Sequence, residues 1–174
     1  IVIDKPFVVG DFIVIGEMAG TVENIGLKTV RVRSLSGEQL IFSNTDMLSS
    51  RVRNYKRMEE RRIVFQVGLI YQTTHEQLAK VPELIKDIVD KQECARFDRS
   101  HFKSFGASSL DFETVYYVTV PDYNTYMDIQ QAINLEVFRV FEEHGLEFAY
   151  PTQTLFVSHE NAAISNDTVK PLLA

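Results

Sequence analysis

Histidine and cysteine, which often act in catalysis or bind metal ions, are few in this sequence and lie far apart along it. The four histidines are His75, His101, His144 and His159. Their spacing does not match a metal-ligand pattern, and none has an acidic neighbour placed to orient its imidazole ring. We interpret them as surface residues. Cys94 is the only cysteine, which is typical of a reducing compartment, and we interpret it as a structural thiol.

Short motifs of catalysis and cofactor binding are also missing from the sequence. It contains no GxSxG nucleophile turn, no GxxxxGK[ST] phosphate loop and no GxGxxG dinucleotide loop. The mixed-charge run at Glu59 and Glu60 is interpreted as solvated surface. We therefore expect no catalytic, cofactor-binding or metal-binding residues, and we expect that the protein is not an enzyme.

Charge is distributed unevenly along the 174 residues. Residues 1–62 contain ten Lys and Arg against eight acidic residues, which gives +2, whereas the remainder contains eight against sixteen, which gives -8. Binding to phosphates requires a concentrated basic surface, so no nucleic-acid partner is expected.

One basic set stands out, and it has three interpretations: a nucleic-acid patch, a ring that attracts anions if copies surround an axis, or a solvated linker balanced by Glu59 and Glu60. We favour the linker, alone or together with the anion-attracting ring. The set consists of Arg51, Arg53, Lys56, Arg57, Arg61 and Arg62.

Short β-branched runs separated by glycines fill the first sixty residues. The runs DFIVI, GTVENI, KTVRVRSL and EQLIF predict four strands of a barrel or sandwich. In residues 29–33, valine and arginine alternate, which indicates a strand with one buried face. A short helical or irregular piece from Asn44 to Ser50 leads into a fifth strand, RVRNY.

The pattern changes at Arg61. RRIVFQVGLIY predicts a long strand, and residues 73–93 predict an amphipathic helix with a capping box from Thr73 to Glu76 and a kink or a broken first turn at Pro82. Two strands follow, joined by a turn at residues 106–108, and then a helix from about Asn124 to His144. A last extended stretch, residues 146–157, completes the order β-α-β-β-α-β, which is the ferredoxin-like arrangement.

Several blocks of the sequence resemble the small-conductance mechanosensitive channel (MscS-like) family. They are PFVVGDFI at residues 6–13, GTVENIGLKT at 20–29, IFSN at 41–44, VGLIYQT at 67–73 and EFAYPTQT at 147–154. The resemblance covers about residues 5 to 157. In one departure, Ser43 precedes Asn44 where many members of the family have proline.

The resemblance implies an Sm-like β barrel over residues 1–60, followed by an α+β ferredoxin-like domain over residues 61–157 and a flexible tail or short extension over residues 158–174. It also implies a homo-oligomer of seven copies beneath a membrane pore, on the cytoplasmic side of the cell membrane, which releases ions and small solutes on hypo-osmotic shock. The pore helix would precede Ile1, so we expect the chain to be a soluble part of a longer protein.

Strand edges give a reason for a ring that does not depend on the resemblance. A barrel of five short strands rarely closes fully, and its open edges carry unpaired N–H and C=O groups. We expect residues 39–42 of one copy to pair with residues 51–55 of the next. Two alternatives remain at this point: an Sm-like RNA-binding ring, and a ligand-sensing regulatory domain of a channel.

Overall fold

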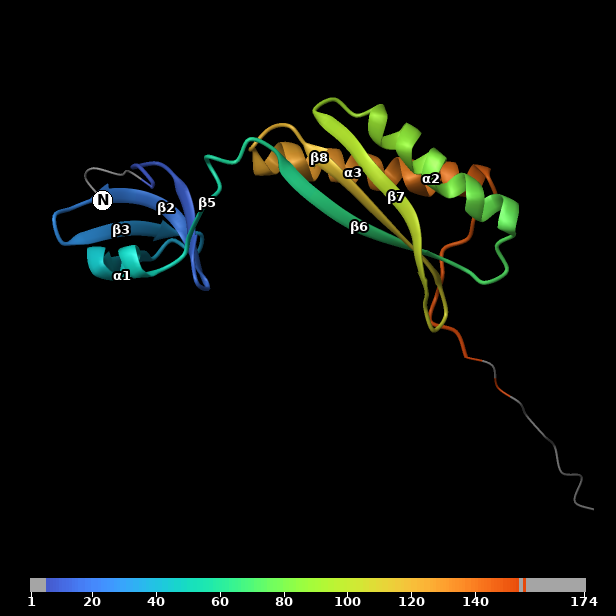
Figure 1. Ribbon diagram of the computed structural model, residues 1–174, viewed down its shortest axis with the longest axis horizontal. Coiled ribbons are helices and arrows are strands. Elements are labelled where there is room, and N and C mark those ends of the chain that lie inside the picture. The colour runs from blue at the N-terminus through green and yellow to red at the C-terminus, as the bar shows by residue number, and fades with distance from the viewer. Residues whose placement is uncertain (1–5, 154, 156–174) are drawn as a thin grey trace, which may run out of the picture.

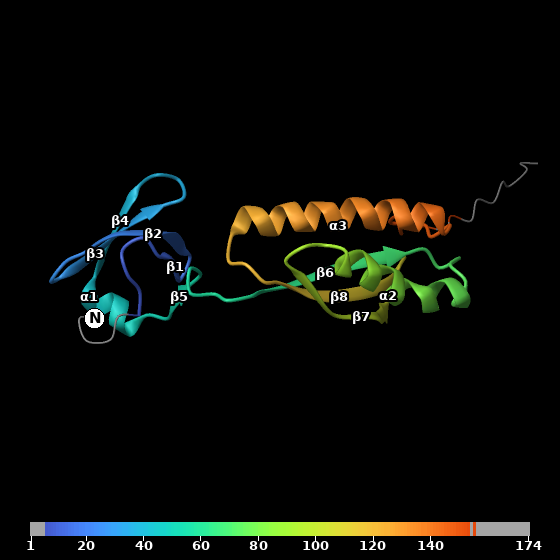
Figure 2. The ribbon, with the colours of Figure 1, turned by 90° about the horizontal axis from the view of Figure 1, so that it is seen from above.

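The computed structural model describes residues 6–153 and 155 of the chain. Two sheets organise these residues, a five-stranded sheet in the order β4-β3-β2-β1-β5 and a three-stranded sheet in the order β6-β8-β7. Figure 1 shows the two sheets in separate domains, and Figure 2 shows the segment that connects them. We call the first the β-domain and the second the α/β domain.

The β-domain is a curled antiparallel sheet around a small apolar core. Its elements are β1 (Phe12–Ile15), β2 (Met18–Ile25), β3 (Thr29–Ser34), β4 (Gln39–Ser43), α1 (Asn44–Ser49) and β5 (Val52–Asn54). The alternation predicted for β3 is confirmed, because Val30 and Val32 are buried whereas Arg31 and Arg33 are exposed. The predicted helical piece is α1, where the Ser43 hydroxyl caps the helix by accepting a hydrogen bond from the Asp46 N–H at 3.0 Å.

Strands β2 and β3 approach each other so closely at Gly20 that no side chain fits there. A Cβ atom at this position would lie 2.2 Å from the carbonyl oxygen of Arg33. The obstacle is backbone, so it cannot move aside as a flexible side chain would. Glycine at position 20 therefore allows the tight curl of the sheet.

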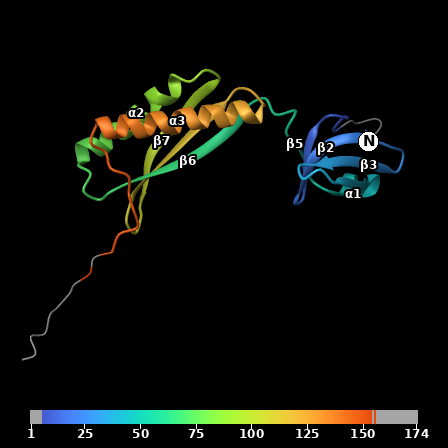
Figure 3. The ribbon, with the colours of Figure 1, turned by 180° about the vertical axis from the view of Figure 1, so that it is seen from behind.

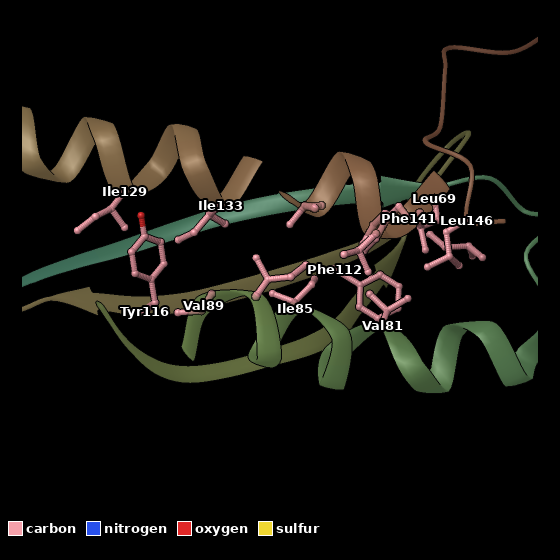
Figure 4. Packing of buried hydrophobic residues seen from close by; sticks show 14 of the residues in the cluster. Leu69, Val81, Ile85, Val89, Phe112, Tyr116, Ile129, Ile133, Phe141 and Leu146 are labelled. Carbon is pink, nitrogen blue, oxygen red and sulfur yellow. The ribbon is translucent and has the colours of Figure 1, made fainter. Parts of the chain in front are cut away.

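The α/β domain packs two helices on one face of its sheet. Its elements are β6 (Arg61–Leu69), α2 (His75–Asp90), β7 (Ala95–Phe105), β8 (Leu110–Val118) and α3 (Tyr123–Glu143). Phe112 and Tyr116, which share a face of β8, contact a single core that also holds Ile85 of α2 and Ile133 of α3 (Figure 4). Figure 3 shows α3 in front of the strands when the molecule is seen from behind.

Helix α2 begins one residue later than predicted. The capping box joins Thr74 and Gln77 rather than Thr73 and Glu76, since the Gln77 N–H donates to the Thr74 hydroxyl while the Gln77 side chain accepts from the Thr74 N–H. The helix also continues through Pro82 without a break, so the expected broken first turn is wrong. The helix is stabilised by its buried face, which includes Val81 and Ile85.

The predicted last strand, residues 146–157, is reduced to a single bridge between Phe148 and Leu69. The Ala149 N–H donates to the Gly68 carbonyl at 2.9 Å. Because strand hydrogen bonds recur every second residue, the next donor toward β6 would be residue 151, which is proline and has no N–H. The strand therefore ends there, and residues 154, 156 and 157 lie outside the described part.

Candidate assembly interface

The β-domain sheet has two open edges, one on β4 and one on β5. The hydrogen bonds from Asn44 N–H to Lys28 C=O and from Ser34 N–H to Glu38 C=O, both 2.9 Å, fix the register between β3 and β4. Leu40 and Phe42 therefore bond to β3, whereas the N–H and C=O groups of Gln39 and Ile41 point away from the sheet. In the described residues, β4 has no strand on that side.

Strand β5 presents the opposite edge of the same sheet. The Tyr55 N–H donates to the Phe12 carbonyl at 2.9 Å, so Arg53, two residues earlier, also bonds to β1. The backbone groups of Val52 and Asn54 then point outward. Pairing of this edge with a β4 edge would form up to about four backbone hydrogen bonds, because two residues on each side contribute an N–H and a C=O.

Asp11 anchors β5 to the start of the domain. Its Oδ2 atom accepts hydrogen bonds from the Val8 N–H at 3.0 Å and from Asn54 Nδ2 at 2.7 Å, and Lys56 Nζ lies 4.0 Å from its Oδ1. Burial by itself would raise the pKa of this carboxyl, but the hydrogen bonds from Val8 and Asn54 and the charge of Lys56 hold the pKa below its ordinary value. The Asp11 side chain thus adds to the backbone pairing with β1 in holding β5 in place.

Exposed apolar side chains lie on β4 and on the elements next to it. Ile41 on β4 is 62% exposed and Leu48 on α1 is 68% exposed, and Leu27 and Leu35, in the turns on either side of β3, are exposed as well. Apolar side chains that gather into one exposed patch are typical of a surface that another molecule covers.

The basic set is not exposed as a whole. Five of its members are exposed, but Arg61 is half-buried among tyrosine rings. Glu60, which was expected to balance the set, pairs instead with Arg96 of β7 at 2.7 Å. Lys56 donates to the Gly10 carbonyl at 3.3 Å.

The described histidines and Cys94, which were considered for catalysis or metal binding, do not form a cluster in the described part of the chain. His75 begins α2, His101 is exposed on β7, and His144 caps α3 with its Nδ1 2.8 Å from the Val140 carbonyl; His159 lies outside the described residues. Cys94 is exposed and belongs to neither core, so the interpretation as a structural thiol is wrong. Over residues 6–153 and 155, no group of three or more His, Cys, Asp or Glu side chains is placed to hold a metal ion.

A second exposed surface lies on α3 and was missed in the sequence. Leu135 and Phe138 are 65% and 61% exposed, and the Phe138 ring stacks on that of Phe148 at a centroid distance of 5.8 Å. A groove between α3 and the open edge of β6 is lined by Phe138, Tyr126 and Val64, among others. The sequence did indicate this surface, because Leu135 and Phe138 are apolar but fall outside the helical spacing of the buried residues of α3.

The described helices include none that is both long and apolar enough to cross a membrane.

Two family profiles match the chain in consecutive segments. Residues 1–57 match "Mechanosensitive ion channel, beta-domain", and residues 63–148 match "Mechanosensitive ion channel MscS, C-terminal". These segments contain the β-domain and most of the α/β domain.

Similar proteins and structures agree with these matches. The chain is 32% identical over 162 residues to the small-conductance mechanosensitive channel MscMJ of Methanocaldococcus jannaschii, covering 92% of this chain and 46% of that protein. It is 29% identical over 164 residues to the low conductance mechanosensitive channel YnaI of Escherichia coli, covering 90% and 47%. This chain thus spans less than half the length of these relatives.

The fold is shared with solved structures. The crystal structure of Helicobacter pylori MscS in a closed state superposes with a TM-score of 0.72 at 22% identity, covering 90% of this chain and 61% of that one. The cryo-EM structure of Arabidopsis thaliana MSL1 gives a TM-score of 0.75 at 18% identity, covering 84% and 54%. The chain therefore belongs to the MscS family of mechanosensitive ion channels, of which it contains the β-domain and the carboxy-terminal domain.

Proposed function

We propose that this chain forms the vestibule of a mechanosensitive channel that releases ions and small solutes on hypo-osmotic shock. One observation carries the proposal: a single sheet ends in two open edges, β4 at one end of the strand order and β5 at the other. An edge that pairs with the other edge of an identical copy makes a head-to-tail contact, and such contacts close into a ring when the rotation between copies permits it.

The ring surrounds an axis and needs no catalytic groups. Its proposed size is seven copies, in keeping with the family resemblance. In the full-length protein, sequence outside this chain supplies the membrane-spanning pore, and the ring lies on the cytoplasmic side of the membrane. Ions and small solutes pass through the hollow interior, and neither a cofactor nor a nucleic acid takes part.

Acidic residues of the α/β domain give this vestibule its charge. The residues after position 62 have a net charge of -8 per copy. Repeated around an axis, this charge enriches cations inside the vestibule at low salt, and screening limits the effect to about 10 Å at 0.1 M salt.

The mass of the purified chain in solution tests the ring directly. Light scattering coupled to gel filtration is expected to show a closed oligomer of seven copies. A chain that stays monomeric at every concentration, or that forms open-ended filaments of growing mass, would contradict closure through the β4 and β5 edges.

A further inference from the structure

Arg61, the first residue of β6, lies among three tyrosine rings that come from two parts of the chain. Its Cζ atom is 5.9 Å from the ring centroid of Tyr55, 5.6 Å from that of Tyr123 and 5.4 Å from that of Tyr126. Tyr55 directly follows β5, whereas Tyr123 and Tyr126 form the first turn of α3. The guanidinium therefore lies between the end of the β-domain and the start of a helix of the α/β domain.

The surroundings of the guanidinium favour cation–π contacts over hydrogen bonds. Its Nε atom is buried and has no oxygen partner in the described structure, and its terminal nitrogen donates only a long bond, 3.4 Å, to the Pro121 carbonyl. Attraction between a cation and an aromatic face strengthens when water is excluded. Tyr123 and Tyr126 also pack edge to face at 5.6 Å, which holds two of the rings in place.

Tyr55 connects this cluster to the β-domain. Its N–H donates to the Phe12 carbonyl at 2.9 Å, and its ring packs edge to face on the Phe12 ring at 6.2 Å. A continuous path of contacts thus runs from β1, through Tyr55 and Arg61, to α3. Within the connecting segment, Glu60 pairs with Arg96 of β7 at 2.7 Å.

We propose that Arg61 is a latch that fixes the orientation of the β-domain relative to the α/β domain. The segment that connects them, residues 55–60, contains no helix or strand (Figure 2). It begins with a turn in which the Met58 N–H donates to the Tyr55 carbonyl at 3.4 Å. Domains joined in this way move relative to each other unless a contact holds them. Release of the guanidinium from the rings lets the two domains turn about this segment. Arg61 acts as a positioning residue, and its planar guanidinium suits stacking on rings better than a lysine ammonium does.

Distances between the two domains, measured by double electron–electron resonance, test the latch. Spin labels are attached at Ser36→Cys in the β3–β4 turn and at Lys80→Cys on α2, both exposed positions, in a chain carrying Cys94→Ser. Labelled chain is diluted with unlabelled chain so that only distances within one copy are measured. The variant is Arg61→Gln, and the matched control is Arg62→Gln, which removes the exposed positive charge next to it.

We expect a narrow distance distribution in the parent chain and in Arg62→Gln, and a distribution at least twice as broad in Arg61→Gln. Tyr123→Leu, which removes an exposed ring and leaves Arg61 in place, should broaden the distribution too, and it serves as the test if Arg61→Gln fails to fold. An unchanged distribution in both latch variants, or equal broadening in Arg62→Gln, would overturn the proposal.

Discussion

Replacement of Ile41 by proline is the sharpest test of the open β4 edge. The Ile41 N–H points away from β3, because Leu40 and Phe42 make the bonds to that strand. Proline at position 41 therefore removes no hydrogen bond within the chain, and proline is tolerated on strand edges whose N–H faces outward. It does remove a donor that a neighbouring copy requires, and its ring occupies the space of the approaching strand.

The expected effect follows from the number of bonds at the contact. Loss of one backbone hydrogen bond of about four costs about 0.5–1.5 kcal/mol, before the steric effect of the ring is added. Since 1.4 kcal/mol corresponds to a factor of ten, we expect the lost bond alone to weaken each contact between copies by roughly two- to twelvefold, and the steric effect of the ring to weaken it further. Light-scattering mass as a function of concentration should show dissociation of Ile41→Pro where the parent chain remains assembled.

The matched control is Ile41→Thr, which also loses the exposed apolar side chain but keeps the N–H. It should assemble more strongly than Ile41→Pro. Urea unfolding should confirm that the proline variant is folded. A folded Ile41→Pro chain with the mass of the parent would refute the edge-pairing argument, and equal dissociation of the threonine variant would assign the contact to the side chain instead.

Three further predictions concern the two domains. Gly20→Ala places a Cβ atom against the Arg33 carbonyl and should lower the unfolding free energy of the β-domain by about 1–3 kcal/mol or more; an unchanged urea midpoint would contradict this. The pKa of Asp11 is lower in the folded state than its ordinary value, so its contribution to stability is present above that ordinary value and is lost as the pH falls through the folded pKa. Thermal unfolding between pH 6 and about pH 3 should show this loss, and Asp11→Asn should reduce the pH dependence; parallel curves would refute the role of the carboxylate. Neutralising the acidic residues of α2 and α3 in the full-length channel should shift its reversal potential toward lower cation preference at low salt, and no shift would count against an acidic vestibule.

Short repeats of apolar and polar residues predicted most of the helices and strands. The alternation in β3 placed Val30 and Val32 in the core and Arg31 and Arg33 in water, as the structure confirms. The helix predicted from about Asn124 to His144 is likewise confirmed as α3, which has Ile133 among its buried residues. Such patterns are reliable because a side chain's direction along a regular strand or helix depends only on its position in the repeat.

The predictions that proved wrong concern the first residue of α2 and the length of the last strand. Two successive threonines offered two helix caps, and the choice of Thr74 depends on Thr73 donating its hydroxyl to the Ile70 carbonyl at 2.7 Å. The last strand was overestimated because Pro151 was not recognised as falling at a donor position toward β6. That position depends on the register of the Phe148 bridge, which no local pattern contains.

The sequence by itself determined the order of the elements, the inward face of most of them and the resemblance to a channel family, because these depend on local repeats and on short blocks of residues. Only the tertiary structure decided which backbone groups of β4 and β5 point outward and which rings enclose Arg61. Both depend on strand register and on contacts between residues as far apart as Tyr55 and Tyr126, which meet only after the chain has folded.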